Sequence, residues 1–207
     1  ETPLALVNAL MMSVYLWHIG CIALAAGILL ALSMAAPAAS GLLLAQPTVA
    51  LVNNAQREHQ EFMGSVLATA LENGAAFGEL PSDGVAVFPG DDPHTPLWRE
   101  LAAGRTCLSF GLTPECAVRA DPGAQPGRFD LHLGDDTLTV QLSIDGVHNV
   151  RNALAAAACA HAIGIDPARI IEGLANFRPV RGRLARLRSA RGAQLIDDSY
   201  NANPDSV

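Results

Sequence analysis

The sequence predicts an α/β fold: a mostly parallel sheet with helices and a small antiparallel patch, preceded by an apolar helix and followed by the start of a second α/β unit. Two observations support this prediction. Several short runs are continuously apolar and rich in β-branched residues, as expected of strands buried on both faces. Later runs alternate apolar and polar residues, as expected of antiparallel strands with one face in water.

The first element is an apolar segment. No charged residue lies between Glu1 and Arg57, and residues 4–32 are almost continuously apolar. A charge-free stretch longer than about 18 residues is typical of a transmembrane helix; the alternative is a pair of alanine-rich helices buried in a soluble core. A secretory signal is not expected, because the basic region that precedes its apolar stretch is missing.

A parallel part is predicted from residue 47 onward. Runs such as TVALV and GVAVF have the composition of doubly buried strands. Between the strands, Asp91-Asp92-Pro93 suits a helix start, because proline fits the first helical turn. The strands are expected at residues 48–52, 84–88 and 106–110, and the helices over residues 58–77 and from Asp91 onward.

An antiparallel part and two further helices follow. Gly134-Asp135-Asp136 suits a hairpin turn between two alternating runs. Asp166 and Pro167 fit the N-cap and the first turn of a helix. The strands are expected at residues 117–120, 129–133 and 137–144, the helices at 150–163 and 168–176, and a separate pair of strands at 184–188 and 194–196.

The composition excludes several classes of function. The chain has 207 residues and a net charge of −7, which argues against binding nucleic acid through its phosphates. All 13 basic residues are arginine, so the chain supplies neither a Schiff-base lysine nor the lysine of a Walker loop. Its four cysteines lack the spacing of a zinc site or a disulfide framework. Because the chain begins at Glu1 and ends in a polar, turn-rich run, we expect it to be a fragment.

The first candidate site follows the strand at residues 48–52. Asn53 and Asn54 come at its carboxyl end, and Glu58 and His59 follow closely. Ligands of open α/β sheets bind beyond the carboxyl ends of the strands, so these side chains could hold a hydrated cation or a phosphate. An ordinary helix N-terminus with capping amides explains the same residues, and the spacing leaves both interpretations open.

Two further clusters lie later in the chain. Asn149 and Asn152 stand at the start of an alanine-rich helix, whose N-terminus suits a nucleotide, although a plain N-cap explains Asn149 as well. Seven of the 13 arginines fall within residues 169–191, in an otherwise acidic chain. Such a run suits an anionic ligand, whereas a solvated basic face is the alternative.

These clusters together carry a family resemblance. The runs GVHNVRNALAAAACAHAIGI, FRPVRGRLARL and LIDDSYNANPDS resemble the Mur ligases, over about residues 42–207. PTVALVNNAQREHQEF and VAVFPGDDPHTPLWREL look like the second half of the central ATPase domain of that family. The resemblance points to the members that join D-Ala-D-Ala to UDP-N-acetylmuramoyl-tripeptide in peptidoglycan synthesis. A folylpolyglutamate synthase-like ligase, which shares the architecture, is the alternative.

The resemblance implies a reaction and its residues. ATP would phosphorylate the terminal carboxylate of the tripeptide, and the amine of D-Ala-D-Ala would attack the acyl phosphate, with ATP and Mg2+ as cofactors. By motif position, His59 would be a catalytic residue and magnesium ligand, and Arg183 a catalytic residue that contacts the ATP phosphates. Asn149 and Asn152 would lie by the nucleotide, with Asn149 the better candidate, Asp198 would bind the ribose, and Asn201 and Asn203 would shape the hinge and the substrate side.

The sequence also departs from the family. The glycine-rich loop with lysine and threonine is absent, and Asn73 stands where the family usually has a modified lysine. We therefore expect the fragment alone to be inactive. The N-terminal run containing YLWH faintly resembles a transmembrane helix of membrane acyltransferases, so a fusion of unrelated pieces is expected near residues 36–44. In the competing interpretation, an acyltransferase piece anchors an inactive α/β domain.

The expected organisation follows from these resemblances. An apolar segment would occupy residues 1–41, a partial central ATP-binding domain residues 42–177, and the start of the C-terminal ligase domain residues 178–207. The ligase part is expected to be a cytoplasmic monomer that binds UDP-N-acetylmuramoyl-tripeptide and D-Ala-D-Ala but no nucleic acid. Membrane association would involve only residues 4–35.

Overall fold

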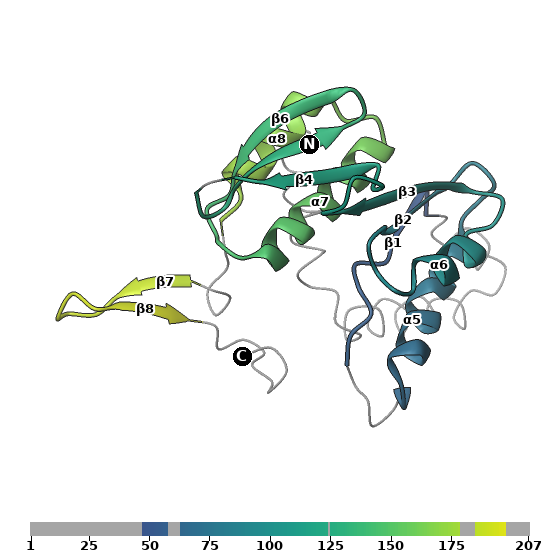
Figure 1. The fold of residues 1–207 in the computed structure, drawn as a ribbon, viewed down its shortest axis with the longest axis horizontal. Coiled ribbons are helices and arrows are strands. Elements are labelled where there is room, and N and C mark those ends of the chain that lie inside the picture. Colours follow the sequence, from purple (N-terminus) through teal and green to yellow (C-terminus); the bar gives the residue numbers. More distant parts are fainter. Residues whose placement is uncertain (1–46, 58–62, 124, 179–184, 198–207) are drawn as a thin grey trace, which may run out of the picture.

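The computed structural model describes residues 47–57, 63–123, 125–178 and 185–197, and Figure 1 shows their arrangement. They form a six-stranded sheet with helices and a separate two-stranded sheet. Within these residues, no helix is long and apolar enough to cross a membrane. The predicted apolar segment over residues 4–35 lies outside the described part of the chain.

The six-stranded sheet is parallel at one end and antiparallel at the other. Its strands lie in chain order: β1 (Val49–Leu51), β2 (Val85–Pro89), β3 (Thr106–Gly111), β4 (Val118–Pro122), β5 (Arg128–Leu133) and β6 (Asp136–Gln141). The pairs from β1 to β4 are parallel, whereas β5 runs antiparallel to both β4 and β6. Gly134, in the tight turn between β5 and β6, has the positive φ of 60° that such hairpins favour. The predicted fold class is confirmed.

The parallel part is buried on both faces. Its helices are α5 (Val66–Gly74), α6 (Thr95–Leu101) and α7 (Val147–Ala162). Neighbouring residues of β2 point to opposite faces, as the strand period of two requires. Phe88 packs in a cluster with Trp98 of α6, whereas Val87 belongs to the larger cluster built around α7. This double burial explains the continuously apolar runs in the sequence.

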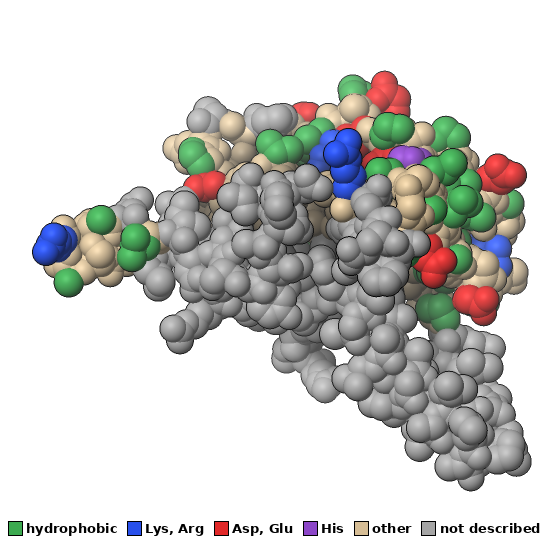
Figure 2. Space-filling view, turned by 90° about the horizontal axis from the view of Figure 1, so that it is seen from below, with side chains coloured by type: hydrophobic (Ala, Val, Ile, Leu, Met, Phe, Trp, Pro, Cys, Tyr) green, Lys and Arg blue, Asp and Glu red, His purple; other side chains and the backbone are tan. Residues whose placement is uncertain are grey.

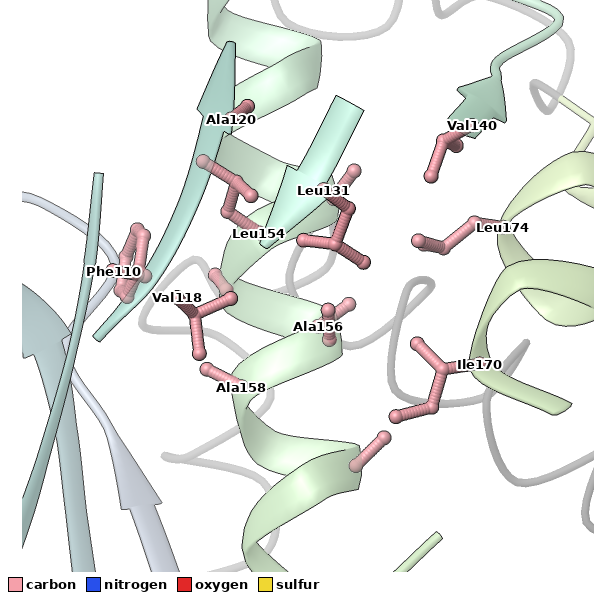
Figure 3. Close-up of a cluster of buried hydrophobic side chains, with 14 of the residues drawn as sticks. Phe110, Val118, Ala120, Leu131, Val140, Leu154, Ala156, Ala158, Ile170 and Leu174 are labelled. Atoms are coloured by element: carbon pink, nitrogen blue, oxygen red, sulfur yellow. The ribbon is translucent and has the colours of Figure 1, made fainter. Parts of the chain in front are cut away.

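The antiparallel part is buried on one face only. Val118, Leu131 and Val140 point inward from β4, β5 and β6 and pack against α7 and α8 (Pro167–Asn176), as Figure 3 shows. Alternate residues such as Asp130 and Thr139 are exposed. The sequence pattern of these strands alternates because one face packs on the core and the other is exposed to water, as predicted.

Helix α7 forms the centre of the larger cluster. The eight residues 153–160, six of them alanine, are each at most 4% exposed. Small side chains allow neighbouring elements to approach closely, and α7 contacts all of the strands from β1 to β5. The turn between α7 and α8 ends at Asp166, whose side chain caps α8 by accepting from the Ala168 N–H, as predicted.

Three helices begin elsewhere than predicted. Of the helix expected over residues 58–77, residues 58–62 lie outside the described part of the chain. Helix α5 begins only after the N-cap Ser65, and Gly64 before it has a φ of 72° that does not fit a helix. Helix α5 ends in a 3-10 turn, η2 (Ala75–Glu79). Helix α6 begins at Thr95 and not at Asp91: the Asp92 carboxylate accepts the His94 N–H, and the Asp91 carboxylate accepts from Arg151. Helix α7 begins three residues before the predicted Val150.

The last two strands form their own sheet. β7 (Ala185–Arg188) and β8 (Gln194–Asp197) pair antiparallel and have no partner among the strands of the larger sheet. This agrees with the prediction that a separate unit starts after α8. The domain boundaries at residues 41 and 177 remain predictions.

Candidate functional site

The candidate site lies where the parallel strands end. Because β1, β2 and β3 are parallel, the residues that follow them meet at one edge of the sheet. The N-terminal turns of α7 reach the same edge. Asn53, after β1, donates from Nδ2 to Oδ1 of Asn152 on α7 at 2.9 Å, across 99 residues of sequence. The edge thus joins two of the candidate clusters that the sequence predicts.

The two amides of this pair have different surroundings. Asn53 Oδ1 is buried and has no hydrogen-bond partner, which is uncommon for a polar atom in a folded protein. Asn152 is half-buried, and none of its atoms is a buried group without a partner. Its Oδ1 accepts from Asn53, whereas its Nδ2 has no hydrogen-bond partner among the described residues, so Nδ2 is the atom most open to a ligand.

Asn149 has a different position from Asn152. It is fully buried, and its Nδ2 donates to the backbone oxygen of Asp145 at 2.6 Å. The N-cap of α7 is Gly146, with a φ of 108°, so Asn149 is not the N-cap. Its side chain holds the loop that leads into the helix. The geometry therefore favours Asn152 over Asn149 as the residue accessible to a ligand.

A partly buried ion pair holds Arg151, the residue of α7 that precedes Asn152. Arg151 donates from Nη1 and Nη2 to the two oxygens of Asp91 at 2.7 and 2.8 Å. Oδ2 of Asp91 also accepts the Leu112 N–H at 2.9 Å, and the Asp91 side chain is only 6% exposed. One carboxylate therefore ties together α7 and the segments that follow β2 and β3.

The pKa values of this pair reflect its contacts. Burial acts to raise the pKa of Asp91, but the hydrogen bonds from Arg151 and Leu112 and the charge of Arg151 outweigh it and lower that pKa overall. The Asp91 hydrogen bond raises the pKa of Arg151. Both groups are thus held in their charged forms. The sequence pattern predicts Asp91 only as part of a helix start and indicates no role for Arg151, because nothing local in the sequence links two residues 60 positions apart.

The remaining predicted residues are only partly described. Asn73, at the position of the family's modified lysine, donates from Nδ2 to the Asn54 backbone oxygen at 3.1 Å and so holds the end of β1. His59, Arg183, Asp198, Asn201 and Asn203 lie outside the described residues. Over the residues that are described, no group of three His, Cys, Asp or Glu side chains could hold a metal ion.

Four arginines of the run have described side chains, and they lie on or just after α8 and on the β7–β8 hairpin. Arg169 pairs with Glu172 on α8 at 2.9 Å, and Arg178 donates to backbone oxygens at the end of that helix. Arg188 and Arg191 are exposed on the β7–β8 hairpin, where Figure 2 shows basic side chains at the outer end. The roles of this run at an anionic ligand remain a prediction.

Comparison with known families gives a direct match. The profile of the Mur ligase middle domain matches residues 29–160, which is more than half of the chain. The match begins 13 residues before residue 42, where the family resemblance was expected to start, and so includes the last part of the apolar segment.

Individual relatives agree with this match. The chain is 34% identical over 168 residues to the UDP-N-acetylmuramoyl-tripeptide--D-alanyl-D-alanine ligase of Escherichia coli, covering 79% of this chain and 37% of that one. It is 35% identical over 173 residues to the UDP-N-acetylmuramate--L-alanine ligase of Xanthomonas campestris, covering 76% and 35%. The chain therefore spans little more than a third of the length of these relatives.

Solved structures show the same similarity. A MurF crystal structure from Acinetobacter baumannii matches with a TM-score of 0.71 and 33% identity, covering 78% of this chain and 36% of that one. The Thermotoga maritima MurF ligase in complex with ADP matches with a TM-score of 0.64 and 27% identity, covering 78% and 38%.

Proposed function

Because the chain belongs to the Mur ligase family, we propose that it is part of an ATP-dependent amide ligase of peptidoglycan synthesis and that its carboxyl-edge site faces the nucleotide. The observation that carries this proposal is the meeting of Asn53, Asn152 and the Asp91–Arg151 pair at the strand ends, on a fold shared with an ADP-bound family member. Open α/β sheets bind ligands at such an edge.

The proposed substrates are UDP-N-acetylmuramoyl-tripeptide and D-Ala-D-Ala. The similarity to the E. coli ligase that is named for this reaction and to the A. baumannii MurF structure supports them. The ligase named for addition of L-alanine to UDP-N-acetylmuramate is about equally identical over a similar length, so the DSYNANPDS run is the feature that favours the D-Ala-D-Ala reaction. From the same similarity we propose a cytoplasmic enzyme, and we propose that it is a monomer.

The residues of this chain would act mainly by binding and orienting. The free Nδ2 of Asn152 donates to the nucleotide, while Asn149 and the Asp91–Arg151 pair keep the first turns of α7 in place. Arg183 would meet the phosphates and Asp198 the ribose, with Asn201 and Asn203 at the hinge. A cation near the transferring phosphoryl group offsets its charge, which is the main work in phosphoryl transfer.

Magnesium is the second proposed cofactor. Mg2+ prefers carboxylate and water oxygens, but the best-placed described carboxylate, Asp91, already binds Arg151 and the Leu112 N–H. The described residues therefore do not form a magnesium site by themselves. The proposal rests on His59 and on the family resemblance.

The test is an ADP titration of the 15N-labelled 207-residue chain, monitored by two-dimensional NMR. We expect ADP to shift the signals of the carboxyl edge, including Asn152 and Arg151, and to leave those of the β5–β6 hairpin unchanged. Because the chain has no lysine to meet the phosphates, we expect no phosphate release from ATP above that of a His59→Ala control. Absence of ADP-dependent shifts, or shifts confined to the hairpin, would refute the proposed site.

A further inference from the structure

The hydrogen bond between Asn53 and Asn152 has a defined donor and a defined acceptor. Asn53 donates and Asn152 accepts at 2.9 Å, so the oxygen of Asn152 is used inside the protein and its NH2 group is not. Asn53 Oδ1 is buried without a partner. An asparagine can present either its carbonyl oxygen or its NH2 group to a ligand. Asn152 therefore presents its NH2 group.

The buried surroundings of Asn53 explain this direction. If both amides turned over, Asn152 Nδ2 would donate to Asn53 Oδ1, and Asn53 Nδ2 would become the buried group without a partner. An NH2 group has two donors to satisfy, and buried N–H groups without partners are rarer in proteins than carbonyl oxygens that lack them. The observed orientation leaves the less costly atom unpaired.

The backbone around Asn152 is held independently of this hydrogen bond. Arg151 is bound through both Nη atoms to the Asp91 carboxylate, and residues 153–160 that follow are buried. The α7 turn that carries Asn152 is therefore anchored on both sides. What remains adjustable at this position is the side-chain amide, which can rotate to exchange its oxygen and nitrogen.

We infer that Asn53 is a positioning residue: it fixes the amide of Asn152 so that the NH2 group, and not the carbonyl oxygen, faces the bound nucleotide. This inference rests on the proposed function of the edge. It assigns the ligand atom at Asn152 to the acceptor class, which comprises a phosphate oxygen, a ribose oxygen or an unprotonated ring nitrogen. A metal ion does not fit at this NH2 group, because N–H donors do not ligate cations.

Two variants of Asn53 test the inference in the 207-residue chain. In Asn53→Asp, the carboxylate can only accept, so Asn152 must turn its NH2 group inward and present its oxygen to the ligand. In Asn53→Leu, which adds no charge, the amide of Asn152 loses its partner and its preferred direction. Asn176→Asp, at an exposed position on α8, adds the same charge as the first variant away from the site and is the matched control.

ADP affinity and the side-chain NH2 signals of Asn152 are the two readouts. We expect ADP affinity to fall about tenfold or more in Asn53→Asp and severalfold in Asn53→Leu, the scale of one lost hydrogen bond to a ligand, and to remain unchanged in Asn176→Asp. In the wild type, ADP should shift the Asn152 NH2 signals. In Asn53→Asp these signals should already be displaced without ADP and should not respond to it.

The outcomes separate the inference from the proposed function. If the wild type binds ADP and Asn53→Leu binds it equally well, with Asn152 signals that respond as in the wild type, Asn53 is not a positioning residue. If both Asn53 variants lose affinity only in proportion to a lowered melting temperature, the role is structural and the inference is wrong. If the wild-type chain binds no ADP, the proposed function fails, and the inference fails with it.

Discussion

Strands β1–β3 and strands β4–β6 share one hydrophobic cluster around α7 but place their polar side chains differently. In the parallel part these side chains follow the strand ends and pair with α7, as in Asn53–Asn152 and Asp91–Arg151, across 99 and 60 residues. In the antiparallel part they lie on the strands themselves. There His132 pairs with Asp121 at 2.7 Å, across only 11 residues.

The two parts also differ in whether their polar groups keep hydrogen-bonding capacity for a ligand. On the outer face of β4–β6, Thr137 completes the contacts of His132 at 3.1 Å, and Thr139 donates to Asp130. Such cross-strand pairs are a general means of stabilising a sheet. At the carboxyl edge, by contrast, the amide of Asn152 keeps an unused donor. The polar groups cited on the antiparallel face are thus paired with one another, whereas the edge keeps a donor available for the proposed ligand.

The largest expected effect concerns the shared core. Leu131 is fully buried beneath the antiparallel part, so Leu131→Ala should lower the free energy of unfolding by about 3 kcal/mol through lost burial and a new cavity. Urea denaturation of the 207-residue chain measures this. Val147→Ala, at a position 62% exposed, is the control and should change stability by less than about 0.5 kcal/mol. A loss below about 1 kcal/mol in Leu131→Ala would show that the antiparallel part is not part of one cooperative core.

The next effect concerns the ion pair at the edge. Arg151→Met leaves the buried carboxylate of Asp91 without its counter-charge and should cost about 2 kcal/mol, less than for a fully buried pair because Arg151 is partly exposed. The exposed pair Arg169–Glu172 provides the control: Arg169→Met should cost less than about 0.5 kcal/mol. Equal losses in the two variants, measured by urea denaturation at pH 7, would mean that burial adds nothing to the Asp91 contact.

A smaller effect follows from pH. Because the folded-state pKa of Asp91 is lowered, its contribution to stability is complete above the unfolded pKa of about 3.9 and is lost as the pH falls through the folded value. The stability difference between the wild type and Arg151→Met should therefore shrink as the pH is lowered from 7 toward 3. A difference that stays constant over this range in parallel urea titrations would contradict a lowered pKa for Asp91.

The smallest effect is expected on the antiparallel face. His132→Ala removes a cross-strand pair whose partner Asp121 is two-thirds exposed, and it should cost no more than about 0.5 kcal/mol. It should leave ADP binding unchanged, whereas the Asn53 variants weaken it. Thermal melts beside ADP titrations measure both properties. A change in ADP affinity in His132→Ala would contradict the proposal that the carboxyl edge, and not the antiparallel face, binds the nucleotide.

The fold class could be predicted from the sequence because burial on one or two faces leaves a local pattern. Continuous apolar runs marked the parallel strands and alternation marked the antiparallel ones, and the separate β7–β8 pair was also expected. The helix starts were less predictable. Asp91 looked like the beginning of a helix, but its carboxylate binds Arg151, and a local pattern contains no information on such a distant partner.

The same reason limited the prediction of the site. The sequence indicated that Asn53 follows a strand and that Asn152 lies near a helix N-terminus, which are local properties. It did not indicate that the two amides pair, nor that Asn149 turns inward to the Asp145 carbonyl. The roles of His59, Arg183, Asp198, Asn201 and Asn203 remain predictions that depend on the family resemblance.

The alanine-rich middle of α7 has a consequence for how this domain tolerates substitution. Because residues 153–160 are buried on every side, an added methylene group there would meet close-packed neighbours and cost about 1–3 kcal/mol. Residues 147 and 148 at the helix start are exposed and carry no such penalty. Sequence drift in this helix should therefore be smallest over residues 153–160 and largest at exposed positions such as 147 and 148, so that the close-packed middle of the helix stays the same while its surface changes.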